Sequence, residues 1–277
     1  MTNESYYRIP LPDAWQECFK TLRRSIVNTS CSEAVLELYL SRITREAMAN
    51  VHWLEDACPE FIPPAAWPIS EANLPELPVV EEDQCLLIGQ HQVMHRWQAP
   101  LMEILAQNVC QNGGNILEIG FGLGIASEAI QRCDIKSHTI IEGHPAVFQR
   151  MVDWAQARSG ANIRTVPGLW SSAIPRLGTF DGVLFDPYPL NEDEFRQHWL
   201  EDITFAAHFF PHASRLLRED GRFTYYSNEI DSVSREHQRQ LLRYFRRIEI
   251  EIVDGLCPPP SCQYWWASTM VAITAIK

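Results

Sequence analysis

The stretch Ile116-Leu117-Glu118-Ile119-Gly120-Phe121-Gly122-Leu123-Gly124 decides the fold, because it reads as a short apolar strand followed by a glycine-rich turn. A helix is expected directly after the turn, over residues 125–131. Glycine has no Cβ, so the backbone of such a turn can pass close to a ligand. Open α/β sheets bind ligands at the carboxyl ends of their strands, which is where this turn lies. The stretch therefore predicts an α/β fold with a ligand site at the turn.

Outside this turn, strand-like and helix-like segments alternate along the chain. Apolar strands are expected at 116–119, 139–141, 163–166, 182–185, 223–226, 248–253 and 266–275. Helices are expected at 93–109, 125–131, 147–157, 198–217 and 235–245. Strands joined by crossover helices form mainly parallel sheets that are covered on both faces. The sequence thus predicts a Rossmann-like domain with a mainly parallel, seven-stranded sheet and helices on both faces.

The first part of the chain has a different pattern. Residues 1–60 are predicted to form an N-terminal helical extension, because apolar residues recur there at helical spacing. Residues 57–80 are rich in proline, which fixes φ and removes backbone donors, so a stiff connector is expected. The extension would be an extra layer, a lid or the interface of a homodimer, and the sequence does not choose among them. We place the main domain at residues 61–277.

Charge and composition narrow the classes of partner. The chain has 23 Lys and Arg residues against 35 Asp and Glu residues, a net charge of −12, which argues against a nucleic-acid-binding surface. Its start lacks the pattern of a signal peptide, and the apolar run at 265–276 is too short to span a bilayer. No C-x-x-C pair is present, so no metal site is expected. These features predict a cytoplasmic protein without membrane or nucleic-acid partners.

Two acids beside the turn indicate which ligand it holds. The dinucleotide fingerprint G-x-G-x-x-G would need glycine at position 125, where this chain has Ile125. The pattern is instead G-x-G-x-G with Glu118 two residues ahead, and a carboxylate suits a cationic ligand better than a pyrophosphate. Glu142 ends the second strand, where a carboxylate can bind a ribose diol. NAD enzymes use the same device, so Glu142 alone does not distinguish the two ligands.

A third acid follows the strand at 182–185. Asp186 comes before Pro187-Tyr188-Pro189, and the prolines make this loop rigid. Parallel strands end at the same edge of the sheet, so Asp186 is expected beside the glycine turn. The alternative is that Asp186 only caps the turn that follows it.

Several segments together resemble one family, the guanidinoacetate N-methyltransferases. They are Val93–Met102, Ile116–Gly122, Ile140–Glu142 with Val147–Arg150 and Asp153-Trp154, Gly168–Trp170, Phe180–Gly182 with Asp186–Leu190, and Pro259–Tyr264. The G-x-G-x-G turn is also similar to motif I of class I S-adenosylmethionine-dependent methyltransferases. The resemblance covers roughly residues 67–277 and implies the class I methyltransferase fold.

The resemblance also implies roles for individual residues. S-adenosylmethionine would be bound by Met94, Met102, Glu118, Gly120, Gly122, Leu123, Gly124, Glu142, Gly143, Gly168, Leu169 and Trp170. The substrate would be bound by Trp67, Gln98, Asp186, Tyr188, Asn228 and Glu229. Asp186 would be the catalytic residue that orients the substrate nitrogen and accepts its proton. Taken alone, methionines at helical spacing such as Met94 and Met102 are more often part of a core.

Two departures from the family concern the substrate. Gln98 stands where enzymes acting on guanidinoacetate carry a glutamate, and a guanidinium suits two carboxylates. Glu229 would repel a substrate carboxylate unless it points away, or it would supply the missing negative charge. We therefore expect an N-methyltransferase acting on a guanidino or related nitrogen of a small molecule, in specialised biosynthesis. A protein arginine methyltransferase and a non-catalytic S-adenosylmethionine-binding module remain the alternatives.

Overall fold

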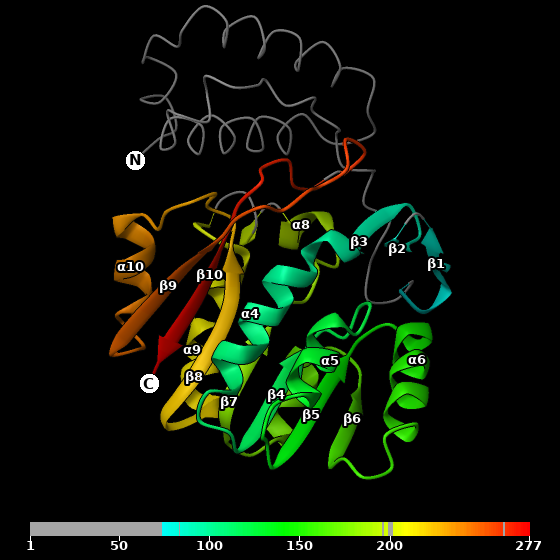
Figure 1. Ribbon diagram of the computed structural model, residues 1–277, viewed down its shortest axis with the longest axis horizontal. Helices are drawn as coiled ribbons and strands as arrows, with labels where there is room; N and C mark the ends of the chain where they lie inside the picture. The colour runs from blue at the N-terminus through cyan, green and yellow to red at the C-terminus, as the bar shows by residue number, and fades with distance from the viewer. Residues whose placement is uncertain (1–73, 83, 196, 199–201, 263) are drawn as a thin grey trace, which may run out of the picture.

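A computed structural model describes residues 74–277 except 83, 196, 199–201 and 263 (Figure 1). The predictions about residues 1–60, the domain boundary near residue 60 and Trp67 lie outside these described residues.

The described residues form a seven-stranded sheet with the order β6-β5-β4-β7-β8-β10-β9. Pairing is parallel from β6 to β8, whereas β10 runs antiparallel to both β8 and β9. The strands are β4 (Asn115–Ile119), β5 (Ser137–Glu142), β6 (Ile163–Pro167), β7 (Phe180–Phe185), β8 (Leu217–Ser227), β9 (Arg247–Val253) and β10 (Met270–Ile276). The prediction of a mainly parallel, seven-stranded sheet is confirmed.

Helices cover both faces of this sheet, as expected (Figure 1). One face packs on α4 (Ala99–Cys110), α5 (Ile125–Gln131) and α6 (Pro145–Gln156); the other packs on α7 (Trp170–Ala173), α9 (Phe210–Leu216) and α10 (Arg235–Leu241). Neighbouring residues of one strand point to opposite faces, so Ile116 packs in the first core and Leu117 in the second. The short helices are η2 (Leu74–Glu76), η3 (Arg96–Gln98), η4 (Ile174–Arg176), α8 (Glu192–Glu194) and η6 (Phe205–Phe209).

A small antiparallel sheet was not predicted. It contains β1 (Val79–Glu82), β2 (Cys85–Ile88) and β3 (His91–His95), and in Figure 1 it lies above the end of the main sheet. The helix predicted over 93–109 is therefore wrong in its first part, because Met94 pairs with Leu86 in this sheet and α4 begins only at Ala99. Pro100 favours a helix start at this point, since its missing N–H is not needed in the first turn.

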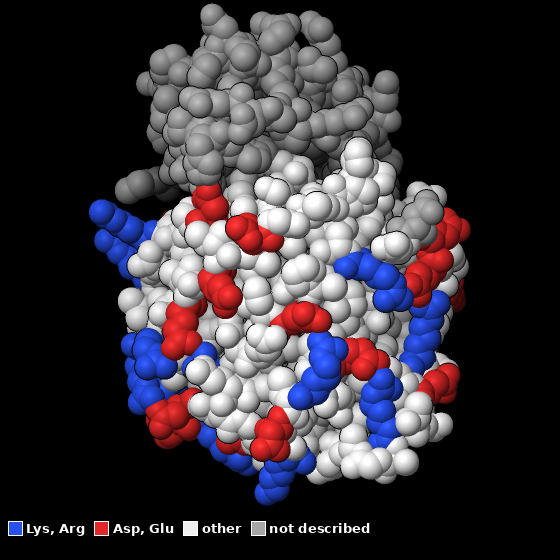
Figure 2. All heavy atoms as spheres, viewed as in Figure 1, with Lys and Arg blue, Asp and Glu red and all other residues white. Residues whose placement is uncertain are grey.

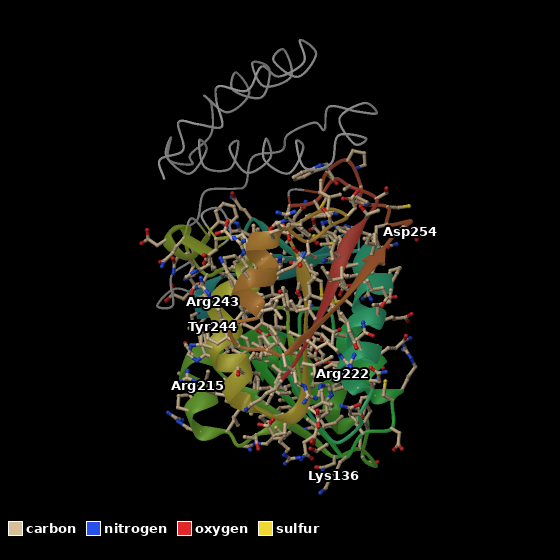
Figure 3. The ribbon with its side chains drawn as sticks, turned by 90° about the vertical axis from the view of Figure 1, so that its left-hand side faces the viewer. Lys136, Arg215, Arg222, Arg243, Tyr244 and Asp254 are labelled. Atoms are coloured by element: carbon tan, nitrogen blue, oxygen red, sulfur yellow. The ribbon has the colours of Figure 1, made fainter. Side chains whose placement is uncertain are left out.

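The helix predicted over 198–217 is also shorter in the structure. Thr204 has extended backbone, η6 follows it, and α9 begins at Phe210 with a proline in its first turn. Arg222 of β8, labelled in Figure 3, links this strand to α4 and β9. Its Nε donates to the Asn108 carbonyl at 2.7 Å, and its guanidinium pairs with Glu249. None of the helices in the described part of the chain combines the length and the apolar character needed to cross a bilayer.

Candidate functional site

A deep cavity opens at the carboxyl ends of β4, β5 and β7, beneath the small sheet. The space between its walls is about 920 Å³, part of it open to solvent. The register explains its position, since Ile119 lies opposite both Ile141 and Phe185, so the residues that follow these three strands share one edge. Leu86, Ile88 and Met94 close the cavity from the small sheet.

The glycine turn forms the floor of this first cavity. Gly120 and Gly122 line it with φ angles of 90° and 53°, which L-residues with side chains rarely adopt. A Cβ on Gly122 would lie 2.8 Å from Met94 Sδ, and a Cβ on Gly120 would lie 2.5 Å from the Asp186 carbonyl oxygen. Glycine at both positions therefore lets the Asp186 loop and Met94 close around the same space.

Glu142 stands at the end of β5 and lines the cavity. Its carboxylate accepts hydrogen bonds from the Phe121 N–H at 3.0 Å and the His144 N–H at 2.7 Å. Burial raises the pKa of Glu142, and these backbone donors act against that rise. The backbone N–H groups of Gly122 and Gly143 also lower this pKa, so the carboxylate is held by the turn on one side and lines the cavity on the other.

The part of the first cavity next to Glu142 has an apolar lining. Gly143, Gly168, Leu169 and Trp170 all line the cavity, and a Cβ on Gly143 would lie 2.9 Å from Leu169 Cδ2. Trp170 also packs edge-on against Phe209, with ring centroids 5.1 Å apart. Leu169 therefore packs directly on the backbone of Gly143, and the two residues form one continuous apolar wall.

A second cavity, with about 760 Å³ between its walls, adjoins the first. The two cavities share the residues of one wall, which are Val93, Asp186, Pro187, Tyr188, Pro189 and Phe205. Asp186 is the charged residue of that wall. Its N–H donates to the Ile119 carbonyl at 3.0 Å, which fixes the start of the loop against the end of β4.

The Asp186 carboxylate receives no hydrogen bond from any described residue. Burial, with a smaller contribution from the negative charge of Glu118, raises the pKa of Asp186 to about 8. A cation that entered either cavity at this wall would favour the ionised carboxylate. Strongly shifted carboxyl groups in a cavity are typical of residues that move protons.

The sequence profile of the family described as "Guanidinoacetate N-methyltransferase" matches residues 67–277. This chain belongs to that family.

Curated proteins that are similar to part of this chain are named protein arginine N-methyltransferase 2. The protein of Emericella nidulans is 26% identical over 154 residues, covering 53% of this chain and 33% of the relative. That of Cryptococcus neoformans var. neoformans is 32% identical over 125 residues, covering 42% of this chain and 33% of the relative. The chain thus spans about a third of the length of these relatives.

Solved structures with a partly similar fold include two enzymes. Spermidine synthase from Thermotoga maritima has a TM-score of 0.49 at 12% identity and covers 72% of this chain and 68% of its own. Precorrin-6y C5,15-methyltransferase from Geobacter metallireducens has a TM-score of 0.45 at 11% identity and covers 72% of this chain and 94% of its own.

Four residues that the family resemblance assigns to the cofactor lie outside the cavity walls in this family member. Met102 is fully buried in the first turn of α4 and packs in the core. Gly124, with φ of 73°, begins α5 beneath the Phe121 ring. The Leu123 N–H approaches Met94 Sδ at 3.4 Å. None of these three residues lines the first cavity.

Glu118 is the fourth of these residues and lies fully buried behind the turn. Ser127 Oγ donates to its Oε2 at 2.6 Å, and His138 Nε2 lies 2.8 Å from the same oxygen. Its other oxygen, Oε1, is buried without a partner. Glu118 therefore acts on the site by its charge, which contributes to the raised pKa of Asp186.

Some of the residues assigned to the substrate line a cavity, and others lie outside both cavities. Tyr188 lines both cavities, and Asn228 lines the second, where its Oδ1 accepts from Thr204 Oγ1 and the Phe205 N–H at 3.1 Å each. Gln98 is buried outside both cavities, and its Oε1 accepts from the Tyr264 hydroxyl at 2.7 Å and the His95 N–H at 3.1 Å.

Glu229 points away from the second cavity. Its carboxylate lies 2.7 Å from His237 Nδ1 and accepts from the Ser234 N–H at 2.9 Å. Although burial opposes the shift, these partners lower the pKa of Glu229. The repulsion of a substrate by Glu229, which the sequence left open, is therefore not expected from this geometry.

The sequence analysis missed most walls of the second cavity. Tyr226, Tyr264 and Trp265 line it together with Phe195 and Phe205. One signal was available for Tyr226, because it lies near the carboxyl end of β8, the strand next to β7, and so lies near Asp186. Elsewhere, the described residues contain no group of three or more His, Cys, Asp and Glu side chains arranged to hold a metal ion.

Proposed function

We propose that this protein is an S-adenosylmethionine-dependent N-methyltransferase acting on a guanidino or related nitrogen of a small molecule. One observation carries the proposal: Asp186 stands in the wall shared by a glycine-turn cavity and a second, adjoining cavity. Membership of the guanidinoacetate N-methyltransferase family supports the reaction type and the cofactor.

The first cavity fits S-adenosylmethionine in its chemistry. All charged side chains among its described lining residues are acidic, namely Glu142, Asp186 and Glu194. Such walls suit a ligand with a sulfonium and an ammonium and would repel a pyrophosphate. Glu142 would hold the ribose, Gly120 and Gly122 would admit the amino-acid portion, and Leu169 would lie along the adenine. The cofactor, when bound, supplies an electrophilic methyl group.

The residues of this chain prepare the nitrogen for that methyl group. Asp186 would hold the substrate by an N–H and accept its proton as the new C–N bond forms, so that a guanidinium substrate gives a methylated guanidinium of the same charge. Pro187 and Pro189 limit the motion of the loop, which helps to hold the nitrogen in line. The apolar residues of the shared wall, such as Val93 and Phe205, exclude water from the reacting atoms.

A protein arginine side chain is the second candidate substrate. The named relatives favour it, although their match covers only about a third of their length. On the face seen in Figure 2, acidic and basic side chains are interspersed and no acidic groove for a basic peptide stands out.

We also infer that the enzyme is cytoplasmic and belongs to specialised biosynthesis, and cell fractionation would test its location. We further infer that it forms a homodimer through residues 1–60, and analytical ultracentrifugation would test this.

Calorimetric titration with S-adenosylhomocysteine tests the proposal first. Micromolar binding, followed by methyl transfer to a guanidino compound or an amine, is the expected result. Transfer to an arginine-containing peptide but to no small molecule would favour the second candidate. Nucleoside binding with no transfer to any nitrogen would indicate the non-catalytic binding module, and absence of nucleoside binding would contradict all three.

A further inference from the structure

The second cavity has an unusual combination of walls. Aromatic side chains dominate its described lining: Tyr188, Phe195, Phe205, Tyr226, Tyr264 and Trp265. Asp186 is the single charged side chain among the described residues that line it, and no Lys or Arg is among them. Aromatic faces attract cations and offer nothing to a carboxylate.

The tyrosine hydroxyls add polarity without charge. Burial raises the pKa of Tyr226 above its ordinary range, and the nearby Asp186 raises it further. Burial likewise raises the pKa of Tyr264 well above its ordinary value. Both hydroxyls therefore stay protonated at neutral pH, and Asp186 is the group of this cavity that a bound cation can convert to an anion.

Tyr226 and Asp186 are also free to bind a ligand. The Tyr226 hydroxyl, like the Asp186 carboxylate, makes no hydrogen bond to any described residue. A nitrogen cation between them would donate one hydrogen bond to the carboxylate and a second to the hydroxyl oxygen. With Asp186 ionised by the bound cation, this pair supplies two acceptors with a total charge of −1.

Tyr264 is held in place by Gln98. The Tyr264 hydroxyl donates to Gln98 Oε1 at 2.7 Å, and the ring stacks on Trp97 with centroids 6.2 Å apart. A glutamate at position 98 would bring a second negative charge next to the Tyr264 hydroxyl. Gln98 thus positions a neutral aromatic wall instead of contacting the substrate.

We propose that the second cavity binds an organic cation without a carboxylate: a guanidinium or ammonium group sits between Asp186 and Tyr226, and an uncharged remainder packs against Tyr264 and Trp265. This inference rests on the proposed function and narrows its substrate class. It excludes guanidinoacetate as the preferred substrate.

The electrostatic reason is the carboxylate of guanidinoacetate. It would enter a cavity whose described lining offers Asp186 as its charged group, and burying a carboxylate without a cationic partner is costly. An uncharged tail avoids that cost and gains contact with the rings. During transfer the guanidinium nitrogen bonds to the methyl carbon as the methyl–sulfur bond breaks, S-adenosylhomocysteine leaves, and one proton passes to Asp186. A guanidinium substrate thus yields a methylated guanidinium of the same charge.

A matched pair of ligands tests this inference. Guanidinoacetate and guanidinoacetamide have nearly the same size, and only the first carries a carboxylate. With S-adenosylhomocysteine saturating, we expect guanidinoacetamide to bind at least about tenfold more tightly in calorimetry. Equal or tighter binding of guanidinoacetate would overturn the inference while leaving the methyltransferase proposal intact. Loss of S-adenosylhomocysteine binding itself would instead overturn the proposed function.

A substitution at Tyr226 tests whether the cation binds in the second cavity. Tyr226→Phe removes the hydroxyl and keeps the ring, and we expect about a fivefold loss of guanidinoacetamide affinity with S-adenosylhomocysteine affinity unchanged. Tyr244→Phe is the matched control, because Tyr244 is 40% exposed just after α10 (Figure 3), and it should change neither affinity. An unchanged guanidinoacetamide affinity in Tyr226→Phe would contradict the role of the hydroxyl.

Discussion

The two cavities meet at Asp186 but are built differently. The first depends on three short turns, at 120–122, 142–144 and 168–170, whose backbone and glycines shape the space. The second is assembled from side chains far apart in the sequence, such as Gln92, Tyr226 and Tyr264. The shape of the first cavity depends on the lack of side chains at its glycines, whereas the second cavity depends on which side chains line it. The first cavity should therefore be sensitive to an added methyl group, and the second to lost rings, hydroxyls and charge.

The largest expected effect is at the wall that the cavities share. Asp186→Asn keeps the shape but cannot accept a proton, so turnover should fall by about 10²–10⁴-fold while S-adenosylhomocysteine affinity stays within about threefold. Steady-state kinetics and calorimetry on the same samples measure both. Asp254→Asn, at an exposed position after β9 (Figure 3), is the control and should leave both unchanged. Full turnover in Asp186→Asn would contradict the proton-accepting role.

The next largest effect is expected in the first cavity alone, at Glu142. Glu142→Gln replaces one acceptor oxygen of the carboxylate with an N–H₂ group, which then faces a backbone N–H of Phe121 or His144. We expect S-adenosylhomocysteine affinity to fall by about 10- to 100-fold, the usual scale for hydrogen bonds to a charged group. Glu251→Gln on the exposed edge strand is the control. Unchanged nucleoside affinity in Glu142→Gln would remove Glu142 from the site.

An added methyl group tests the backbone nature of the first cavity. Gly122→Ala places a Cβ 2.8 Å from Met94 Sδ at a φ of 53°, and we expect about a tenfold loss of S-adenosylhomocysteine affinity. Gly255→Ala is a close control, because its φ is 69° but no atom lies within 4 Å of the added Cβ. It carries the backbone strain without the contact, so it should lower the Tm slightly and leave binding intact.

The pH dependence tests the electrostatics of the shared wall. Asp186 accepts a proton only when ionised, so kcat/KM should rise by about tenfold between pH 7 and pH 9, following a pKa of about 8. Because this pKa is raised from 3.8 to about 8 in the folded protein, the ligand-free fold loses stability as pH rises from about 4 to about 8, and the loss levels off above that. The Tm of the wild type relative to Asp186→Asn should fall over the same window. A flat profile would contradict both expectations.

The smallest effect is expected at Glu229. Its carboxylate binds His237 and the Ser234 N–H away from the cavity, so Glu229→Gln should change guanidino-ligand affinity by less than about twofold. It should lower the free energy of unfolding by about 1 kcal/mol, because the charged hydrogen bond is lost. Since the pKa of Glu229 is lowered in the fold, that loss should shrink as the medium becomes acidic. A large change in affinity would place Glu229 in the substrate site after all.

The sequence predicts the first cavity well because its determinants are local. A strand, a glycine turn and an acid two residues ahead specify Gly120 and Gly122, and helix α5 begins and ends where expected. The prediction of a helix over 93–109 failed because tertiary pairing overrides the local pattern there. The segment around Met94 has the apolar spacing of a helix but pairs with β2. Gln98 and Glu229 were recognised as departures, but their partners, Tyr264 and His237, lie 166 and 8 residues away, and only packing shows which way each side chain turns.

The strand order has a consequence for how the protein is made. β10 follows β9 in the chain but lies between β8 and β9, so β9 has no strand to pair with until β10 has been synthesised. The strands β4 to β8, which carry the glycine turn, Glu142 and Asp186, can pair before that. Tyr226 lies opposite Ala272 of β10, and Tyr264 and Trp265 come just before β10. The nascent chain can therefore organise its first cavity while the ribosome is still adding the residues that complete the second.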